Sequence, residues 1–249
     1  MLHQDKVALI TGAGSGIGRN TAYTLAAEGA RIVVTDINQE GGQETVENIK
    51  SKGGDAFFIK NNVADWDDVQ HMFRSAVDHY GRIDIAVNNA GIGSPDFAKT
   101  ADKALEDWDR IIAVNQTGVF YCMKVELTHM LKQGGGCIIN IASIAGIRGL
   151  PNASAYVASK HAVVGLTRTA AMEYAKRNIR VNALCPVFTP SGLFKPELYG
   201  EIADKLKAGI PMKRFSDVQE MADAINWLAS DKASFVTGHA LPVDGGLTA

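Results

Sequence analysis

The sequence is poor in the residues that cross-link chains, bind metals or span membranes. Its 249 residues include only three cysteines, Cys122, Cys137 and Cys185, which lie far apart and in no Cys-x-x-Cys spacing. This pattern argues against a disulfide framework and favours a reducing, cytoplasmic compartment. The six histidines show no HxH or HxxxH spacing, so we expect no metal site. No apolar run reaches the length of about 18 residues that a membrane-spanning helix needs.

The chain also lacks an excess of charge of either sign. Its 25 Lys and Arg residues against 27 Asp and Glu residues leave a net charge of −2. This balance argues against nucleic acid or an acidic membrane surface as a partner. The first six residues do not have the basic-then-apolar layout of a secretory signal. No repeat or Pro/Ser-rich linker divides the chain, so we expect one domain over residues 1–249.

Short β-branched runs alternate with longer segments of helical periodicity. This alternation predicts an α/β fold, a doubly wound parallel sheet of about seven strands with helices on both faces. The expected strands are 7–10, 32–36, 56–59, 83–87, 138–141, 179–184 and 240–243. The expected helices include one that begins near Gly16 and stops before Gly29, one over 39–52, one capped by Asp65, and one over 154–175. Four of the seven prolines lie within 186–211, and we interpret 187–212 as an irregular, mobile substrate loop.

A glycine-rich segment follows the first expected strand and reads Thr11-Gly12-Ala13-Gly14-Ser15-Gly16-Ile17-Gly18. Four glycines at alternate positions cost conformational entropy on folding. They are useful where the backbone must approach a ligand closely and helix N–H groups must face an anion. The spacing is TGxxxGxG rather than GxGxxG, which would need glycine in place of Ile17. The segment therefore predicts a phosphate-binding turn.

Asp36 closes the second expected strand, 18 residues after Gly18. A carboxylate at this place can accept hydrogen bonds from both hydroxyls of an adenosine ribose. A 2′-phosphate there would face it with like charge, and one such charge at about 4 Å costs ~1–4 kcal/mol. Neither Ser15 nor Ile37 nor Asn38 is basic and able to offset that repulsion. The sequence therefore favours NAD over NADP.

Tyr156 and Lys160 are spaced to share one face of a helix, and Ser143 stands 13 residues before Tyr156. Ionising a tyrosine of ordinary pKa near neutral pH costs ~4 kcal/mol. An ammonium about 4 Å away supplies ~4 kcal/mol at an effective dielectric constant of about 20. The pair can therefore make the phenol a general acid and base.

These motifs, together with Asn88-Asn89-Ala90-Gly91 after the fourth expected strand and Asn115 in a helix, resemble those of the short-chain dehydrogenase/reductase family over the whole chain. The resemblance implies a Rossmann-type fold, a nicotinamide cofactor and reversible hydride transfer between the cofactor and an alcohol or carbonyl carbon. It implies that Tyr156 is the acid and base, that Ser143 donates to the substrate oxygen, and that Lys160 binds the nicotinamide ribose and lowers the pKa of Tyr156. Asn115 would hold a water that links Lys160 to solvent.

By the same resemblance, a set of residues along the chain would contact the cofactor. They are Gly12, Ser15, Gly16, Ile17, Gly18, Asp36, Asn62, Val63, Asn89, Ala90, Gly91, Tyr156, Lys160, Pro186 and Thr189. Two positions depart from the family pattern. Asn62 replaces the usual Asp, and Val187 replaces the usual Gly after Pro186, where a valine disfavours positive φ and adds bulk near the nicotinamide. Either Thr189 or Ser191 would supply the hydroxyl for the carboxamide.

The segments expected to face the substrate are 92–97, 144–150 and 187–212, and they are mostly apolar. They favour a small or medium, largely apolar ketone or secondary alcohol. Family members that reduce acyl-carrier-protein thioesters usually carry Arg where this chain has Met172. Two alternatives stay open: a 3-oxoacyl-thioester reductase and a non-catalytic NAD-binding regulatory protein.

The expected helix over 154–175 is apolar almost all round. Since a helix on one sheet face needs a single apolar stripe, its second face predicts contact with another subunit. A homo-oligomer follows, with a tetramer favoured and a dimer as the alternative. The other interpretation is that the 187–212 segment covers this face.

Overall fold

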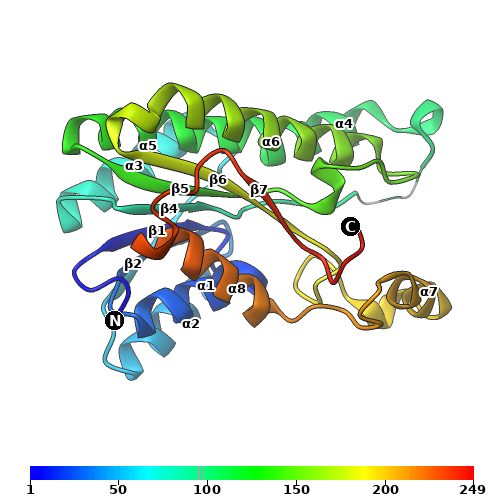
Figure 1. The fold of residues 1–249 in the computed structure, drawn as a ribbon, viewed down its shortest axis with the longest axis horizontal. Helices are drawn as coiled ribbons and strands as arrows, with labels where there is room; N and C mark the ends of the chain where they lie inside the picture. The colour runs from blue at the N-terminus through cyan, green and yellow to red at the C-terminus, as the bar shows by residue number, and fades with distance from the viewer. Residues whose placement is uncertain (95, 97) are drawn as a thin grey trace.

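The computed structural model describes residues 1–94, 96 and 98–249, and its strands form one parallel sheet (Figure 1). The strands are β1 (Val7–Thr11), β2 (Arg31–Asp36), β3 (Ala56–Lys60), β4 (Ile85–Asn88), β5 (Gly136–Ile141), β6 (Ile179–Pro186) and β7 (Ala240–Val243). Their spatial order is β3-β2-β1-β4-β5-β6-β7, and every neighbouring pair is parallel. The chain reverses its direction of winding between β1 and β4, which is where such sheets bind ligands. The predicted fold class is confirmed.

Helices cover both faces of the sheet. They are α1 (Gly16–Ala27), α2 (Gln39–Ser51), α3 (Trp66–Tyr80), α4 (Leu105–Ile112), α5 (Gly118–Gln133), α6 (Ser154–Tyr174), α7 (Glu201–Gly209) and α8 (Val218–Ala229). Figure 1 shows α1, α2 and α8 on one face and α3, α5 and α6 on the other. Strand side chains alternate between two buried apolar clusters, so Leu9 packs with the second helix group and Ile10 with the first. None of the described helices is both long and apolar enough to cross a bilayer.

Local signals in the sequence set several helix ends as predicted. The Asp65 carboxylate accepts hydrogen bonds from the backbone N–H groups of Asp67 at 2.9 Å and Asp68 at 3.0 Å, which caps α3. Gly29, just beyond α1, has a φ of +95°, a conformation that glycine adopts without strain. Strand ends were less accurate: β4 begins at Ile85 rather than at 83. Asp84, just before the strand, accepts the N–H of Val7 through its side chain at 2.9 Å.

The segment 187–212 is more regular than the sequence predicts. It contains a 3₁₀ turn (Pro196–Leu198) and α7. The prolines do not interrupt the helix, because Pro196 starts the 3₁₀ turn and Pro211 follows the end of α7. Gly200, with a φ of +47°, lies between the 3₁₀ turn and α7. An irregular loop over the whole segment was therefore a wrong expectation.

Glu126 of α5 is a completely buried acid beside the central strand β4. Its Oε2 accepts a hydrogen bond from Asn88 Nδ2 at 3.0 Å, and its Oε1 has no hydrogen-bond partner among the described residues. Asn88 also donates to Asn140 Oδ1 at 2.9 Å, and Asn140 donates to Thr167 Oγ1 at 2.9 Å. Burial raises the pKa of Glu126 to about 8, so the carboxyl group is mainly neutral at pH 7.

This raised pKa makes the stability of the protein depend on pH. In the unfolded chain Glu126 loses its proton near its ordinary pKa of 4.5, whereas the folded chain holds it to about pH 8. The folded state therefore binds the extra proton, and the free energy of unfolding falls as pH rises between these values. We predict that the free energy of unfolding of Glu126→Gln, minus that of the unaltered protein, rises by on the order of 3 kcal/mol between pH 5 and pH 8.

Urea unfolding at the two pH values measures this difference. Glu47→Gln, at an exposed position on α2, is the matched control and should leave the pH profile unchanged. A Glu126→Gln protein that keeps the original loss of stability between pH 5 and pH 8 contradicts the prediction.

Candidate active site

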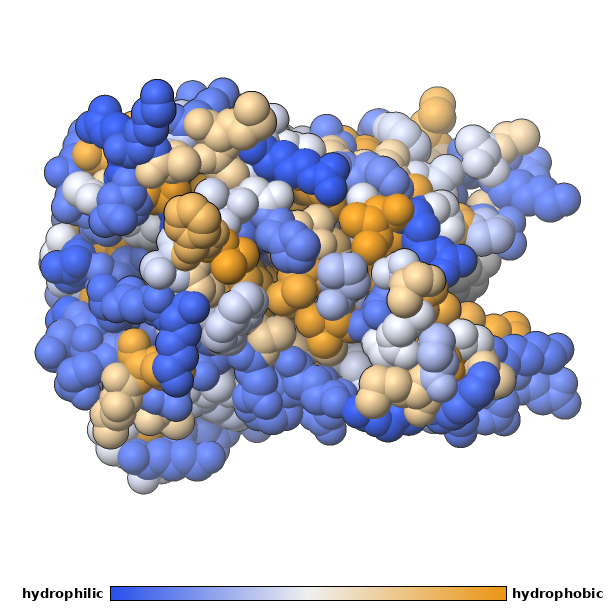
Figure 2. All heavy atoms as spheres, viewed as in Figure 1, coloured by the Kyte–Doolittle hydropathy of each residue, from blue (hydrophilic) through white to orange (hydrophobic). Residues whose placement is uncertain are grey.

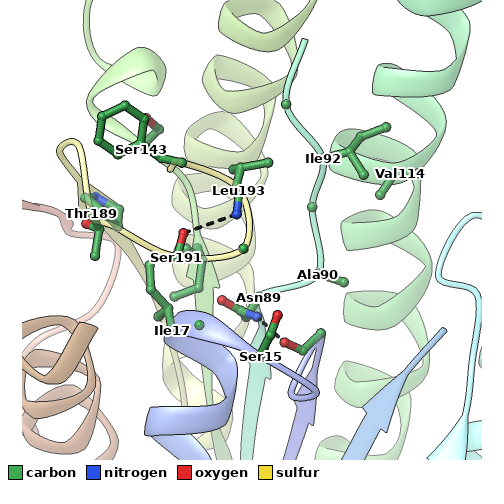
Figure 3. A pocket seen from close by; sticks show the side chains of 18 of the residues that line it. Ser15, Ile17, Asn89, Ala90, Ile92, Val114, Ser143, Thr189, Ser191 and Leu193 are labelled. Atoms are coloured by element: carbon green, nitrogen blue, oxygen red, sulfur yellow. Dashed lines mark hydrogen bonds between the residues drawn. The ribbon is translucent and has the colours of Figure 1, made fainter. Parts of the chain in front are cut away.

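A single cavity of about 710 Å³ runs along the carboxyl ends of the strands, past the glycine-rich turn, Ser143 and the chain after β6 (Figure 3). Almost all of the residues predicted to bind the cofactor line it. They are Gly12, Ser15, Gly16, Ile17, Asp36, Asn62, Val63, Asn89, Ala90, Gly91, Tyr156, Lys160, Pro186 and Thr189. Gly18 does not line the cavity, but it packs against Gly12 and Asn89 at the turn. Segments far apart in sequence therefore meet in one crevice.

The turn from β1 into α1 leaves no room for a side chain at its glycines. A Cβ atom at Gly18 would lie 2.3 Å from Gly12 O and 2.5 Å from Asn89 Nδ2. The Asn89 side chain uses this space to donate hydrogen bonds to Thr11 O at 3.0 Å and Gly12 O at 2.9 Å. Gly12 and Gly16 have φ values of +64° and +53°, which side chains disfavour.

The start of α1 is open to an anion. Its first residue follows Ser15, whose side chain makes no capping hydrogen bond, so the first N–H groups of the helix are not occupied by it. A narrow turn of glycines leading into such a helix end fits the pyrophosphate of a dinucleotide.

Asp36 lies at the end of β2 beside this turn. Its Oδ2 accepts the N–H of Gly14 at 2.8 Å and its Oδ1 accepts the N–H of Asn38 at 2.8 Å. Each oxygen keeps a lone pair for a ligand hydroxyl. The nearby Arg19 guanidinium donates to Gly14 O and Gly41 O and pairs with Glu44 at 2.7 Å. The Arg19 guanidinium therefore faces protein acceptors. The residues around Asp36 fit a ribose whose hydroxyls carry no phosphate.

Ser143, Tyr156 and Lys160 come together from the end of β5 and the first turns of α6. Ser143 and Tyr156 are hydrogen-bonded to one another through their side chains. Lys160 is 4% exposed; its Nζ lies 5.7 Å from the centre of the Tyr156 ring and donates to Ile141 O at 2.7 Å. The predicted constellation is therefore assembled in the structure.

Burial dominates the electrostatics of this group. It raises the pKa of Tyr156 above its ordinary value, and the hydrogen bond from Ser143 lowers the pKa by less. Burial also lowers the pKa of Lys160 to about 8. The lowering of the Tyr156 pKa by Lys160, which the family resemblance implies, stays a prediction. The ammonium donates to Ile141 O, and its nitrogen lies 5.7 Å from the centre of the Tyr156 ring.

Asn115 lies in a π-helical turn (Ala113–Thr117) that joins α4 to α5. Its Nδ2 donates to Ile92 O at 2.9 Å and its Oδ1 accepts the N–H of Ile92 at 2.8 Å, which fixes the chain after β4. A Cβ atom on Gly91 would lie 3.3 Å from Asn115 Oδ1 and 3.6 Å from Lys160 Nζ, so these groups converge around Gly91. Such turns often mark functional sites. The role of Asn115 in holding a water stays a prediction.

The chain after β6 accommodates Val187 without strain. Val187 is not among the residues with positive φ, and its side chain packs with Ile144 and Ile210. Thr189 Oγ1 donates to Val187 O at 2.9 Å and lies 2.7 Å from Ser216 Oγ, whereas Ser191 Oγ accepts the N–H of Leu193 at 3.3 Å. Both hydroxyls line the cavity. The proton of the Thr189 hydroxyl is donated to Val187 O, while the Ser191 hydroxyl accepts from Leu193.

Residues 191–193 form a strap that crosses the cavity, which the sequence did not predict. A Cβ atom on Gly16 would lie 3.1 Å from Ser191 Cβ, and one on Gly93 would lie 3.2 Å from Leu193 Cδ1. Figure 3 shows Ser191 and Leu193 between the turn that carries Ser15 and the chain that carries Ile92. Of the predicted segment 92–97, Pro95 and Phe97 lie outside the described residues.

Sequence reasoning missed several residues that line the cavity: Thr35, Ile37, Asn61, Arg110, Val114, Ile141 and Ala142. Arg110 and Val114 are one helical turn apart, so the position of Asn115 next to Val114 was a usable signal for both. Thr35 and Ile37 flank Asp36 in the sequence. Asn61 precedes Asn62, and Ile141 and Ala142 precede Ser143, so the same kind of signal applied to them.

Comparisons with known proteins agree with this geometry. Residues 12–248 match a family model of short-chain dehydrogenases/reductases described as "Enoyl-(Acyl carrier protein) reductase". The chain is 45% identical to an uncharacterized oxidoreductase of Thermotoga maritima, with all of both chains covered. It is 44% identical to a cyclohexanol dehydrogenase of Acinetobacter sp. (98% of this chain and 95% of that protein). It is 41% identical to a 3-oxoacyl-[acyl-carrier-protein] reductase of Staphylococcus epidermidis (98% and 99%).

Solved structures with the same fold include levodione reductase, with a TM-score of 0.94 and 36% identity over 98% of this chain and 97% of that one. A 3-ketoacyl-(acyl-carrier-protein) reductase from Brucella melitensis, solved in complex with NADH, has a TM-score of 0.91 and 35% identity, with 99% of both chains covered.

Proposed function

The chain belongs to the short-chain dehydrogenase/reductase family of oxidoreductases, and from that premise we propose that it transfers a hydride between NAD(H) and a small or medium, largely apolar secondary alcohol or ketone. One observation carries the proposal. Asp36, which accepts hydrogen bonds from the N–H groups of Gly14 and Asn38, lines the same cavity as Ser143 and Tyr156. A ribose-binding carboxylate and an acid–base group thus share one crevice.

The glycine-rich turn would hold the pyrophosphate, Asp36 the adenosine ribose, and Lys160 the nicotinamide ribose. When bound, the nicotinamide ring accepts a hydride in its oxidised form and returns one in its reduced form. The complex of a similar structure with NADH supports this choice of cofactor.

The protein residues supply the proton chemistry. Ser143 holds the substrate oxygen by a hydrogen bond, and the Tyr156 hydroxyl gives a proton to that oxygen in reduction and takes it back in oxidation. Because burial raises the pKa of Tyr156, positive charge is needed to make its phenolate accessible near pH 7. Lys160 provides one positive charge, and the oxidised nicotinamide adds a second. Asn115 would connect Lys160 to solvent through a water.

Two other functions have less support. A 3-oxoacyl-thioester reductase is consistent with relatives of that name at 41% identity, but Met172 is 85% exposed on α6, where such enzymes usually present an arginine. A non-catalytic NAD-binding regulator has no need of the hydrogen-bonded Ser143 and Tyr156 beside a buried lysine.

We also propose that the protein is a cytoplasmic homo-oligomer, with a tetramer favoured over a dimer. Met172 on α6 and Phe120 on α5 are exposed apolar side chains on one helical layer. Figure 1 shows α7 at the far end of the molecule rather than over α6, which argues against the alternative that this segment covers the helix. The three cysteines are buried free thiols, as suits a reducing compartment.

The cofactor preference is tested by binding. We predict that NADH binds at least about tenfold more tightly than NADPH, because the 2′-phosphate would repel Asp36. Asp36→Asn removes the charge at nearly constant volume and should reduce this ratio by about tenfold. Fluorescence titration of each reduced cofactor measures the dissociation constants, with Asp78→Asn on the exposed side of α3 as the control. Equal affinity of the unaltered protein for both cofactors would falsify the choice of NAD.

The role of Tyr156 is tested by removing one oxygen atom. Tyr156→Phe should lower kcat by about a thousandfold, since it deletes the acid and base, while the dissociation constant for NADH changes little. The substrate is the compound that the unaltered protein reduces best in a panel of ketones, sugars and 3-oxoacyl thioesters, followed by NADH oxidation. Tyr174→Phe, near the end of α6, is the control. Near-normal turnover of Tyr156→Phe would exclude Tyr156 from the mechanism. If only thioesters react in the panel, the proposed substrate class is wrong.

A further inference from the structure

We propose that the substrate end of the cavity selects a compact, ring-bearing ketone or secondary alcohol, and that Phe194 is the residue that makes this selection. The proposal rests on the function proposed above and narrows its substrate class. Phe188 and Phe194 both line the cavity, on the same segment that carries Ser191 and Leu193. Their ring centres are 5.6 Å apart, with an angle of 44° between the planes, so they form a bent aromatic wall.

Phe194 is held in place by rings that do not themselves line the cavity. Phe215 packs edge-on against it, with the ring centres 5.2 Å apart and the planes at 77°. Tyr199 lies on it with the ring centres 5.3 Å apart. Aromatic pairs at these separations are attractive and restrict ring rotation. Phe194 therefore presents a fixed apolar surface rather than a mobile side chain.

The remaining surface at this end is mostly apolar. Ile92, Ile144, Leu150 and Leu193 line the cavity together with the two phenylalanines. Three charged residues are found among the described lining residues, and each has a protein partner. Asp36 accepts from Gly14, Arg110 pairs with Asp107 at 3.4 Å, and Lys160 donates to Ile141 O. A neutral hydrocarbon body with one carbonyl or hydroxyl group suits this surface.

The shape of the cavity favours a ring over an open chain. Its volume of about 710 Å³ must hold the cofactor as well as the substrate. The strap of residues 191–193 closes one side of it. On the face that carries β7 and α8 in Figure 1, which is a different face from the cavity, Figure 2 shows apolar side chains at the centre among polar and charged ones. An open chain must also lose rotational freedom to be ordered there, whereas a ring is already ordered.

The test compares cyclohexanone with its open-chain counterpart 2-hexanone as substrates with NADH. We expect kcat/KM to be at least about tenfold higher for cyclohexanone, and Phe194→Leu to reduce this ratio by about three- to tenfold through loss of the aromatic contact. Phe235→Leu, at a fully exposed position, is the matched control and should keep the original ratio. The dissociation constant for NADH reports whether each variant retains a folded cofactor site.

The same selectivity is measured without turnover. In the NADH complex an alcohol cannot react, so calorimetric titration with cyclohexanol and 2-hexanol gives their affinities directly, and Phe194→Leu should narrow the difference between them. Equal values for the ring and the open chain, or a ratio that Phe194→Leu leaves unchanged, overturn the inference while the proposed hydride transfer stands. Turnover of a 3-oxoacyl thioester with neither ketone accepted removes the proposed function as well.

Discussion

The site depends on the close approach of the turn between β1 and α1 to the chain leaving β4. Gly18 has no space for a side chain because Gly12 O and Asn89 Nδ2 occupy it, and Asn89 binds the turn through two backbone carbonyls. This contact spans the place where the order of the strands reverses, so it fixes the two edges of the crevice relative to one another. Asp36 is then positioned by Gly14, a residue of the same turn. On the other side, Asn115 fixes Ile92, and Gly91 lies beside Lys160.

Burial shifts the pKa of three ionisable groups at or next to the site. It raises the pKa of Glu126 to about 8, raises that of Tyr156 and lowers that of Lys160 to about 8. At Glu126 the result is a neutral acid that accepts a hydrogen bond from Asn88 in β4. At Tyr156 burial keeps the phenol protonated in the protein without cofactor. Its use as a base therefore depends on positive charge gathered around it, of which Lys160 is one source.

The sequence was informative wherever function or folding depends on neighbouring residues. The glycines after β1, the acid at the end of β2 and the pair Tyr156 and Lys160 are each recognised from spacing alone, and so is the cap at Asp65. Features made by residues far apart in the chain were not predictable in this way. Asn115 in the π-helical turn forms a hydrogen bond with Ile92. The strap over 191–193 lies close to Gly16 and Gly93. In the aromatic wall, Phe215 packs against Phe194. The hydrogen bond from the Lys160 ammonium to Ile141 O also joins residues far apart in the chain, and the effect of Lys160 on the pKa of Tyr156 stays a prediction.

A difference titration of the phenol tests the central claim most directly, namely that charge from Lys160 and an oxidised nicotinamide together reverse the effect of burial on Tyr156. Ultraviolet absorbance of the protein minus that of Tyr156→Phe isolates the ionisation of this one side chain. The account predicts a pKa above the ordinary value of about 10 in the free protein and a pKa well below it when NAD⁺ is saturating, with a smaller decrease for NADH. One pKa shared by the free protein and both complexes would contradict it.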